Sequence, residues 1–147
     1  MRHHTLLAAA IVVLGCGADA DEVEPTVANP TVADFAGSWD LVVAFPATGD
    51  TVRAQLSGSA AADDWVMRNP GDQVVRMSTV SLKGDSLILV SDKFTAVVVP
   101  NAVAQVRTAT VRRGDVLEGN LIATFDRADG GQEIRTANLR ATPRPAP

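Results

Sequence analysis

Histidine and cysteine, the side chains that most often carry catalysis or bind transition metals, occur only near the start of this chain. His3, His4 and Cys16 are the only histidines and the only cysteine in 147 residues, and tyrosine is absent. A domain formed from residue 17 onward therefore has no imidazole and no thiol. This excludes Ser-His-Asp and Cys-His catalysis, a histidine general base, and zinc sites with nitrogen or sulfur ligands.

Carboxylates are the main chemical groups that remain, and their spacing favours turns. Asp63 and Asp64 could form half of a glycosidase pair or a calcium site, but two adjacent acids before Trp65 are more typical of a polar corner. Asp126 and Asp129 could bind calcium through oxygen, yet their loop lacks the six to eight ligands of a committed site. We therefore expect no catalytic residue, no metal and no cofactor, with a carboxylate-only enzyme as the least favoured alternative.

Gly-Asp pairs divide the rest of the chain at regular intervals. Glycine permits a positive φ and aspartate caps its own turn, so each pair predicts a hairpin corner. Asp129-Gly130-Gly131 predicts a fifth corner, and the turn fully explains the integrin-type tripeptide Arg113-Gly114-Asp115. The four pairs are Gly49-Asp50, Gly71-Asp72, Gly84-Asp85 and Gly114-Asp115.

Between the corners the residues are β-branched and alternate between apolar and polar, which is the period of a half-buried strand. Short connections predict antiparallel neighbours, and a meander closes into a barrel only with an even number of strands. We expect an all-β, antiparallel up-and-down barrel of eight strands, in which one short segment near Asp92-Lys93 is irregular or merged with its neighbour; a two-sheet sandwich is the alternative. The nine candidate segments are 38–46, 51–58, 64–68, 74–83, 86–91, 94–99, 102–113, 115–127 and 132–142.

The first sixteen residues have the organisation of a signal peptide. A basic start is followed by nine apolar residues, Leu6–Leu14, which as a helix would span roughly 14 Å and so about half a bilayer core. Val13-Leu14-Gly15-Cys16 resembles the lipobox of bacterial lipoproteins. That resemblance implies removal of residues 1–15, lipidation of Cys16, and a location in the cell envelope on the outer membrane or the outer face of the inner membrane.

Residues 16–33 are expected to form a disordered, acidic linker behind this anchor. Asp19, Asp21, Glu22 and Glu24 follow one another without a basic residue, and few large apolar groups are present to offset the entropy of ordering. The extended linker would reach on the order of 55 Å. The domain then occupies residues 34–142, and a proline-rich tail covers 143–147.

Phe35-Ala36-Gly37-Ser38-Trp39 is similar to the Phe-x-Gly-x-Trp motif that opens the first barrel strand of the lipocalins. In that family the tryptophan closes the barrel floor and an arginine of the last strand lies across it. The resemblance implies that Trp39 has this position and that Arg140 covers it through a cation–π contact. The pair is structural in the family and does not bind ligand.

The interior of the barrel is the remaining candidate site. A barrel of eight strands either fills with side chains or holds one small ligand. Six large side chains could line such a cavity or simply form the core: Phe45, Trp65, Met67, Met77, Phe94 and Phe125.

These observations predict a non-enzymatic, lipocalin-like binding or carrier protein for a small hydrophobic ligand, attached to the membrane by its lipid. The alternative is a structural envelope protein with a filled barrel that contacts another envelope protein. A net charge of −4 and a pI near 5.0 argue against nucleic acid as a partner.

Overall fold

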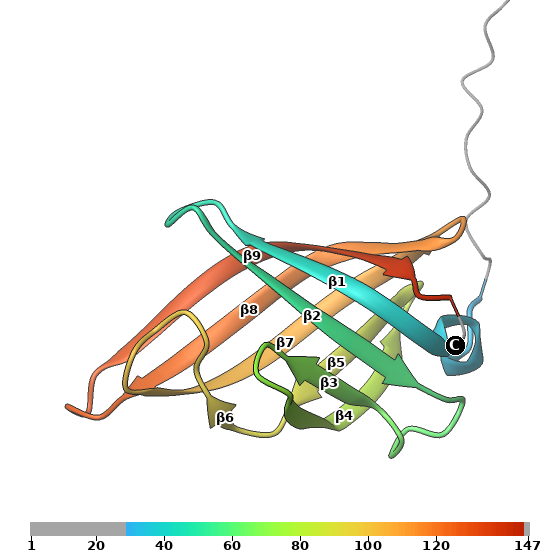
Figure 1. Cartoon of the computed structure of the whole chain (residues 1–147). Coiled ribbons are helices and arrows are strands. Elements are labelled where there is room, and N and C mark those ends of the chain that lie inside the picture. The colour runs from blue at the N-terminus through green and yellow to red at the C-terminus, as the bar shows by residue number, and fades with distance from the viewer. Residues whose placement is uncertain (1–28, 146–147) are drawn as a thin grey trace, which may run out of the picture.

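The structure, a computed structural model, describes residues 29–145, which form nine antiparallel strands and one short 3₁₀ helix (Figure 1). The expected segments 1–15 and most of 16–33, with Cys16, lie outside the described residues. The elements are η1 (Val32–Phe35), β1 (Gly37–Phe45), β2 (Asp50–Gly58), β3 (Val66–Asn69), β4 (Gln73–Lys83), β5 (Ser86–Ser91), β6 (Phe94–Thr95), β7 (Ala102–Arg113), β8 (Val116–Arg127) and β9 (Gln132–Pro143).

Eight of these strands close into an up-and-down barrel. Each strand pairs with the next along the chain, β9 returns to pair with β1, and β5 pairs with β7 to complete the ring. Such closure leaves no free sheet edges of the kind that a two-sheet sandwich has. The prediction of an eight-stranded antiparallel barrel is confirmed.

The ninth strand, β6, is a continuation of β5. Residues 86–90 of β5 pair with residues 107–111 of β7, and Phe94 and Thr95 then pair with Ala104 and Val103 on the same edge of β7. The interruption falls at Asp92-Lys93, where the sequence predicted it. The expected strand 94–99 is shorter than predicted, because β7 begins at Ala102 and offers residues 97–99 no partner.

Glycines form the corners that the Gly-Asp pairs predicted. A positive φ allows the chain to reverse within two or three residues, and glycine adopts it without steric strain. All five predicted corners contain such a glycine: Gly49, Gly71, Gly84, Gly114 and Gly130 have φ between 59° and 84°.

One end of the barrel is sealed by aromatic side chains. Phe35 and Trp65 are fully buried, and Trp39 donates its Nε1–H to the carbonyl of Phe35 at 3.0 Å. Trp65 packs so closely against Gly58 that a Cβ there would lie 2.0 Å from its ring. These groups fill the floor of the barrel. Figure 1 shows η1 at this end.

The short helix η1 brings the preceding segment onto this floor. The Asp34 carboxylate accepts hydrogen bonds from the N–H and the hydroxyl of Thr31, and this pairing lowers the pKa of Asp34. Val32 packs against the core. Residues 32–35, at the expected start of the domain, therefore pack against the barrel.

Candidate functional site

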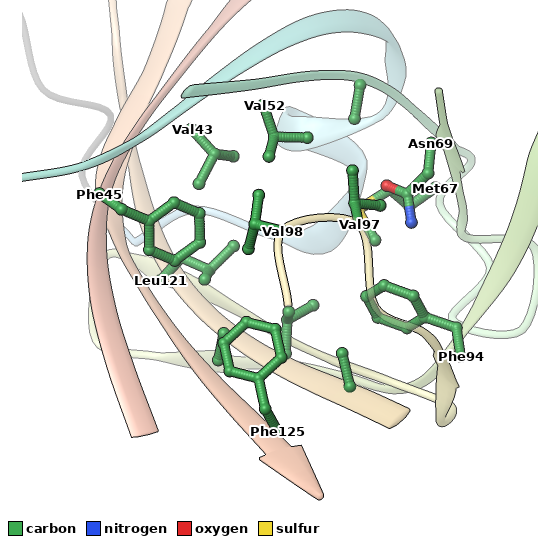
Figure 2. A pocket seen from close by; sticks show the side chains of 14 residues that line it. Val43, Phe45, Val52, Met67, Asn69, Phe94, Val97, Val98, Leu121 and Phe125 are labelled. Carbon is green, nitrogen blue, oxygen red and sulfur yellow. The ribbon is translucent and has the colours of Figure 1, made fainter. Parts of the chain in front are cut away.

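The end of the barrel opposite η1 contains an open, apolar cavity of about 40 Å³ (Figure 2). A buried water molecule needs about 10–15 Å³ measured in this way, so the space holds only a few water molecules. The lining comes from β1, β2, β3, β6, β7 and β8 and from the loop between β6 and β7. It consists of Val43, Phe45, Val52, Ala54, Met67, Asn69, Phe94, Val97, Val98, Ala104, Val106, Leu121, Ala123 and Phe125.

Four of the six side chains expected to line a cavity do so. Phe45, Met67, Phe94 and Phe125 face this space. They point inward because their positions fall on the buried parity of each strand, as the alternation predicted.

The other two expected residues lie deeper in the barrel. Met77, with Met67, lines a second, enclosed void of about 20 Å³, around which the interior is filled by leucine, valine and threonine side chains. Trp65 lines neither space, because its ring covers the floor against Gly58 and its Nε1–H is bonded to the carbonyl of Ser59 at 2.9 Å. The expectation that Trp65 lines the cavity is thus not met.

The loop from Ala96 to Asn101 closes much of the cavity mouth. Its valines are inserted to different depths: Val97 is 44% exposed, Val98 is half-buried and Val99 is buried. Figure 2 shows Val97 and Val98 among side chains from several sides of the barrel, with Val43 and Val52 near one edge. Without these valines, the mouth of the cavity would be wider.

Few backbone hydrogen bonds hold this loop in place. Ala96 donates its N–H to the carbonyl of Ala102 at 2.9 Å, and Ala128 donates to the carbonyl of Asn101 at 3.2 Å. Segments with few such bonds belong to the least stable parts of a protein and open first. The loop is therefore the part of the wall that can move at least cost.

A charged network lies on the rim beside the cavity. Arg135 points inward from β9, with its guanidinium 5.5 Å from the centre of the Phe125 ring and 3.1 Å from the Asp50 carboxylate. Glu133 accepts hydrogen bonds from Arg127 and from Arg135, and these bonds lower its pKa. The two cations and two carboxylates compensate one another, so the network leaves no free charge at the mouth.

A second polar cluster joins the β5–β6 junction to the β8–β9 hairpin. Lys93 Nζ lies 2.8 Å from one carboxylate oxygen of Asp126, and the side-chain amide of Gln132 donates to the other at 3.0 Å. The bond from Gln132, together with Lys93, lowers the pKa of Asp126. Asp126 thus acts as an ion-pair and hydrogen-bond partner of these strands.

The acids considered as catalytic or calcium-binding groups are mostly engaged in turns. Asp64 accepts a hydrogen bond from Ser59, and Asp129 accepts the N–H of Gly131. Asp63 lies exposed in the same loop as Asp64. Within residues 29–145 the structure has no group of three or more acidic, histidine or cysteine side chains placed to hold a metal ion.

The arginine that covers Trp39 is Arg112, and the expectation for Arg140 is wrong. The Arg112 guanidinium lies 5.8 Å from the centre of the Trp39 ring and donates to the carbonyls of Asp34 and Gly114. Arg140 lies between the inward-facing Leu139 and Ala141, so it points outward, is 58% exposed and pairs with Glu118. Gly37, in the same motif, has a φ of 140°, which favours glycine.

Sequence reasoning missed the residues that define the mouth. Val97 and Val98 were expected in a strand, and neither Asn69 nor Arg135 was singled out. Strand parity would have placed Arg135 on the inward side of β9, two residues before the buried Ala137. No pattern in the sequence indicates that residues 96–101 fold into the barrel.

The chain was compared with protein-family models, with curated proteins and with solved structures. No family model matches the chain, and neither the curated proteins nor the solved structures contain a match. No helix within residues 29–145 is long and apolar enough to cross a membrane.

Proposed function

We propose that this chain is a lipid-anchored cell-envelope protein with a lipocalin-like barrel that binds a small hydrophobic ligand and catalyses no reaction. The anchor is the acyl-modified Cys16 of the lipobox-like sequence, and the ligand enters at the open end of the barrel. The lipocalin-like opening motif supports the proposal, because Trp39 occupies the floor of the barrel, opposite the cavity.

The observation that carries the proposal is the difference between the two ends of the barrel. One end is filled by three large aromatic side chains, whereas the other holds an apolar cavity covered by a loop with few hydrogen bonds. Apolar pockets with few polar groups are the usual form of a small-molecule site. A ligand larger than a few atoms has to displace Val97 and Val98, and it replaces their contacts with its own.

A second candidate function follows from how little space is free. A cavity of about 40 Å³ is small for a carrier, and the barrel is otherwise filled. In that case the protein acts through its outer surface, where Ile122 and Ile134 are exposed on the neighbouring strands β8 and β9. Crosslinking in the native envelope would then recover one constant partner.

Titration with N-phenyl-1-naphthylamine, an uncharged fluorescent probe, tests ligand binding. In the full-length chain carrying Cys16→Ser, which cannot be acylated, we expect a saturable fluorescence increase at micromolar concentrations. Ala104→Leu fills the cavity and should weaken binding about tenfold or more, because the probe loses its apolar contacts. Ala44→Leu, the same change on the outer side of β1, should bind the probe as the parent does.

A fluorescence increase that does not saturate, or that is unchanged in Ala104→Leu, would contradict the binding proposal. The second candidate function, contact with another envelope protein, would then remain.

The lipid anchor is tested separately in bacteria fed a labelled fatty acid. The label should be incorporated into the wild-type protein and be absent from Cys16→Ser. Equal labelling of the two proteins would contradict the anchor.

A further inference from the structure

One polar side chain, Asn69, lines the otherwise apolar cavity. It lies at the end of β3, is only 6% exposed, and faces valine, phenylalanine and methionine side chains. Burying an amide in such surroundings is unfavourable unless its hydrogen-bonding atoms find partners. The Asn69 side chain therefore needs two hydrogen-bond partners, an acceptor for Nδ2 and a donor for Oδ1.

A chain of hydrogen bonds determines which atom of this amide faces the cavity. The carbonyl of Thr95 can only accept, so the atom of Gln73 that lies 3.3 Å from it is the donor Nε2. The opposite atom of Gln73, Oε1, then accepts from Asn69 Nδ2 at 3.1 Å. This leaves the carbonyl oxygen, Oδ1, as the atom that Asn69 can offer to a ligand, and Figure 2 shows the amide beside Val97 at the edge of the cavity.

Among the residues that the structure describes, no charged side chain lines the cavity. Arg135 is the nearest candidate cation through its contact with the Phe125 ring, but its guanidinium is bonded to Asp50 and Glu133. A carboxylate in the cavity would lose its hydration without gaining a cation, and its oxygens would face the oxygen of Asn69.

From these contacts we infer that the cavity selects an uncharged apolar molecule with one hydrogen-bond donor, such as an aliphatic alcohol, whose hydroxyl donates to Asn69 Oδ1. The inference rests on the proposed binding function and names the class of ligand. Asn69 contacts the ligand directly, whereas Gln73 is a positioning residue that fixes the orientation of the Asn69 amide.

Three small molecules separate the contributions of donor, acceptor and charge. The isomers 1-hexanol and 1-methoxypentane have the same atoms and similar apolar surface, but only the alcohol can donate a hydrogen bond. Hexanoate has a similar length and carries a negative charge. Each is titrated into the full-length chain carrying Cys16→Ser, and affinities are taken from NMR shifts of residues that line the cavity.

We expect 1-hexanol to bind about tenfold more tightly than 1-methoxypentane, the effect of one hydrogen bond in an apolar site, and hexanoate to bind most weakly. Equal affinities of alcohol and ether would overturn this inference while leaving the binding function in place. Tightest binding of hexanoate would overturn it in favour of recognition by Arg135. Absence of saturable shifts with all three would overturn both the inference and the binding function.

Two variants connect the preference to the amide. Asn69→Leu keeps the shape but removes the acceptor, so the affinity for 1-hexanol should fall to that for 1-methoxypentane, with the latter unchanged or tighter. Gln73→Met lies outside the cavity lining and frees the amide to rotate. Asn69 Nδ2 can then donate a hydrogen bond to the ether oxygen of 1-methoxypentane. The preference for 1-hexanol over this ether should therefore shrink, although Asn69 is unchanged. If Asn69→Leu still prefers 1-hexanol to 1-methoxypentane as the parent does, Asn69 is not the acceptor. If Gln73→Met keeps the full preference, Gln73 does not position the Asn69 amide.

Discussion

Arg112 and Trp39 together hold the floor of the barrel. The guanidinium covers the indole and bonds to the carbonyls of Asp34 and Gly114, so one side chain connects η1, β1 and the β7–β8 corner. Hydrogen bonds from a charged donor are stronger than neutral ones, and a cation over a tryptophan face adds to them. The connection ties η1 to the barrel.

We predict that Arg112→Met lowers the free energy of unfolding by about 2 kcal/mol, because it removes the cation–π contact and leaves two carbonyls without their donor. Urea unfolding followed by tryptophan fluorescence measures the change. Arg140→Met is the matched control, and it should cost less than about 0.5 kcal/mol because the Arg140–Glu118 pair is solvent-exposed. If Arg140→Met lowers the free energy of unfolding more than Arg112→Met does, Arg112 is not the arginine that stabilises the floor.

Strand alternation explains why the motif gave the wrong arginine. On β9 the buried positions are 137, 139 and 141, so residue 140 must point outward. On β7 the buried positions 108 and 110 place residue 112 on the inner side. The alternation in this sequence therefore indicated the correct arginine, whereas the resemblance to the lipocalin motif did not.

At the scale of the elements, the junction between β5 and β6 determines where the cavity lies. Ser91 is fully buried there, and its hydroxyl accepts the N–H of Val106 at 3.0 Å while its carbonyl accepts from Gln105. The serine thus supplies a hydrogen bond that the regular ladder loses at the interruption. The chain can leave the wall after Thr95 without leaving β7 unpaired.

We predict that Ser91→Ala destabilises the protein by about 1–3 kcal/mol, because the N–H of Val106 would be left buried without an acceptor. Amide hydrogen exchange at Val106 should accelerate more than exchange at Leu121 on the neighbouring strand. Ser78→Ala is the control, since that hydroxyl is exposed and its loss should cost little. Unchanged exchange at Val106 would contradict the role given to Ser91.

Most strands could be predicted because local rules and barrel closure agree. Gly-Asp corners determine where β2, β4, β5 and β8 begin, and the apolar alternation determines which face of each strand points inward. Residues 97–99 are the exception. Three consecutive valines favour a strand, but strand propensity is realised only beside a partner, and β7 begins too late to provide one. This loop forms part of the cavity lining. The cavity could therefore not be predicted from local sequence patterns alone.

At the scale of the whole molecule, the floor combines buried aromatic packing with the contacts of Arg112, whereas the rim is held by charged and polar contacts. Floor contacts such as those of Phe35 and Trp65 are apolar and insensitive to pH. The rim depends on Asp126, bonded to Gln132 and Lys93, and on Glu133, bonded to Arg127 and Arg135. Two rim carboxyls have a lowered pKa, against one, Asp34, beside the floor, so acid should loosen the ligand-entry end more than the floor.

Asp126 and Glu133 each have a pKa below the ordinary value, which is 3.8 for aspartate and 4.5 for glutamate. In the unfolded chain the ordinary values apply, so the unfolded state binds protons first as the pH falls. The stabilisation is complete above about pH 5 and is lost as the pH falls through the lowered values of the folded state. We predict that the free energy of unfolding decreases from about pH 5 to pH 3, measured by urea titration at each pH.

The double variant Asp126→Asn, Glu133→Gln should show a shallower decrease over the same range, although it is less stable than the parent at neutral pH. The two amides cannot be protonated, so positions 126 and 133 no longer respond to a change from pH 5 to pH 3. Amide exchange in β8 and β9 near residues 126–133 should then cease to accelerate in acid, while exchange around Trp65 is the same in both proteins. If the variant keeps the full acid sensitivity of the parent, the sensitivity originates elsewhere, and the rim carboxyls do not control the opening of the mouth.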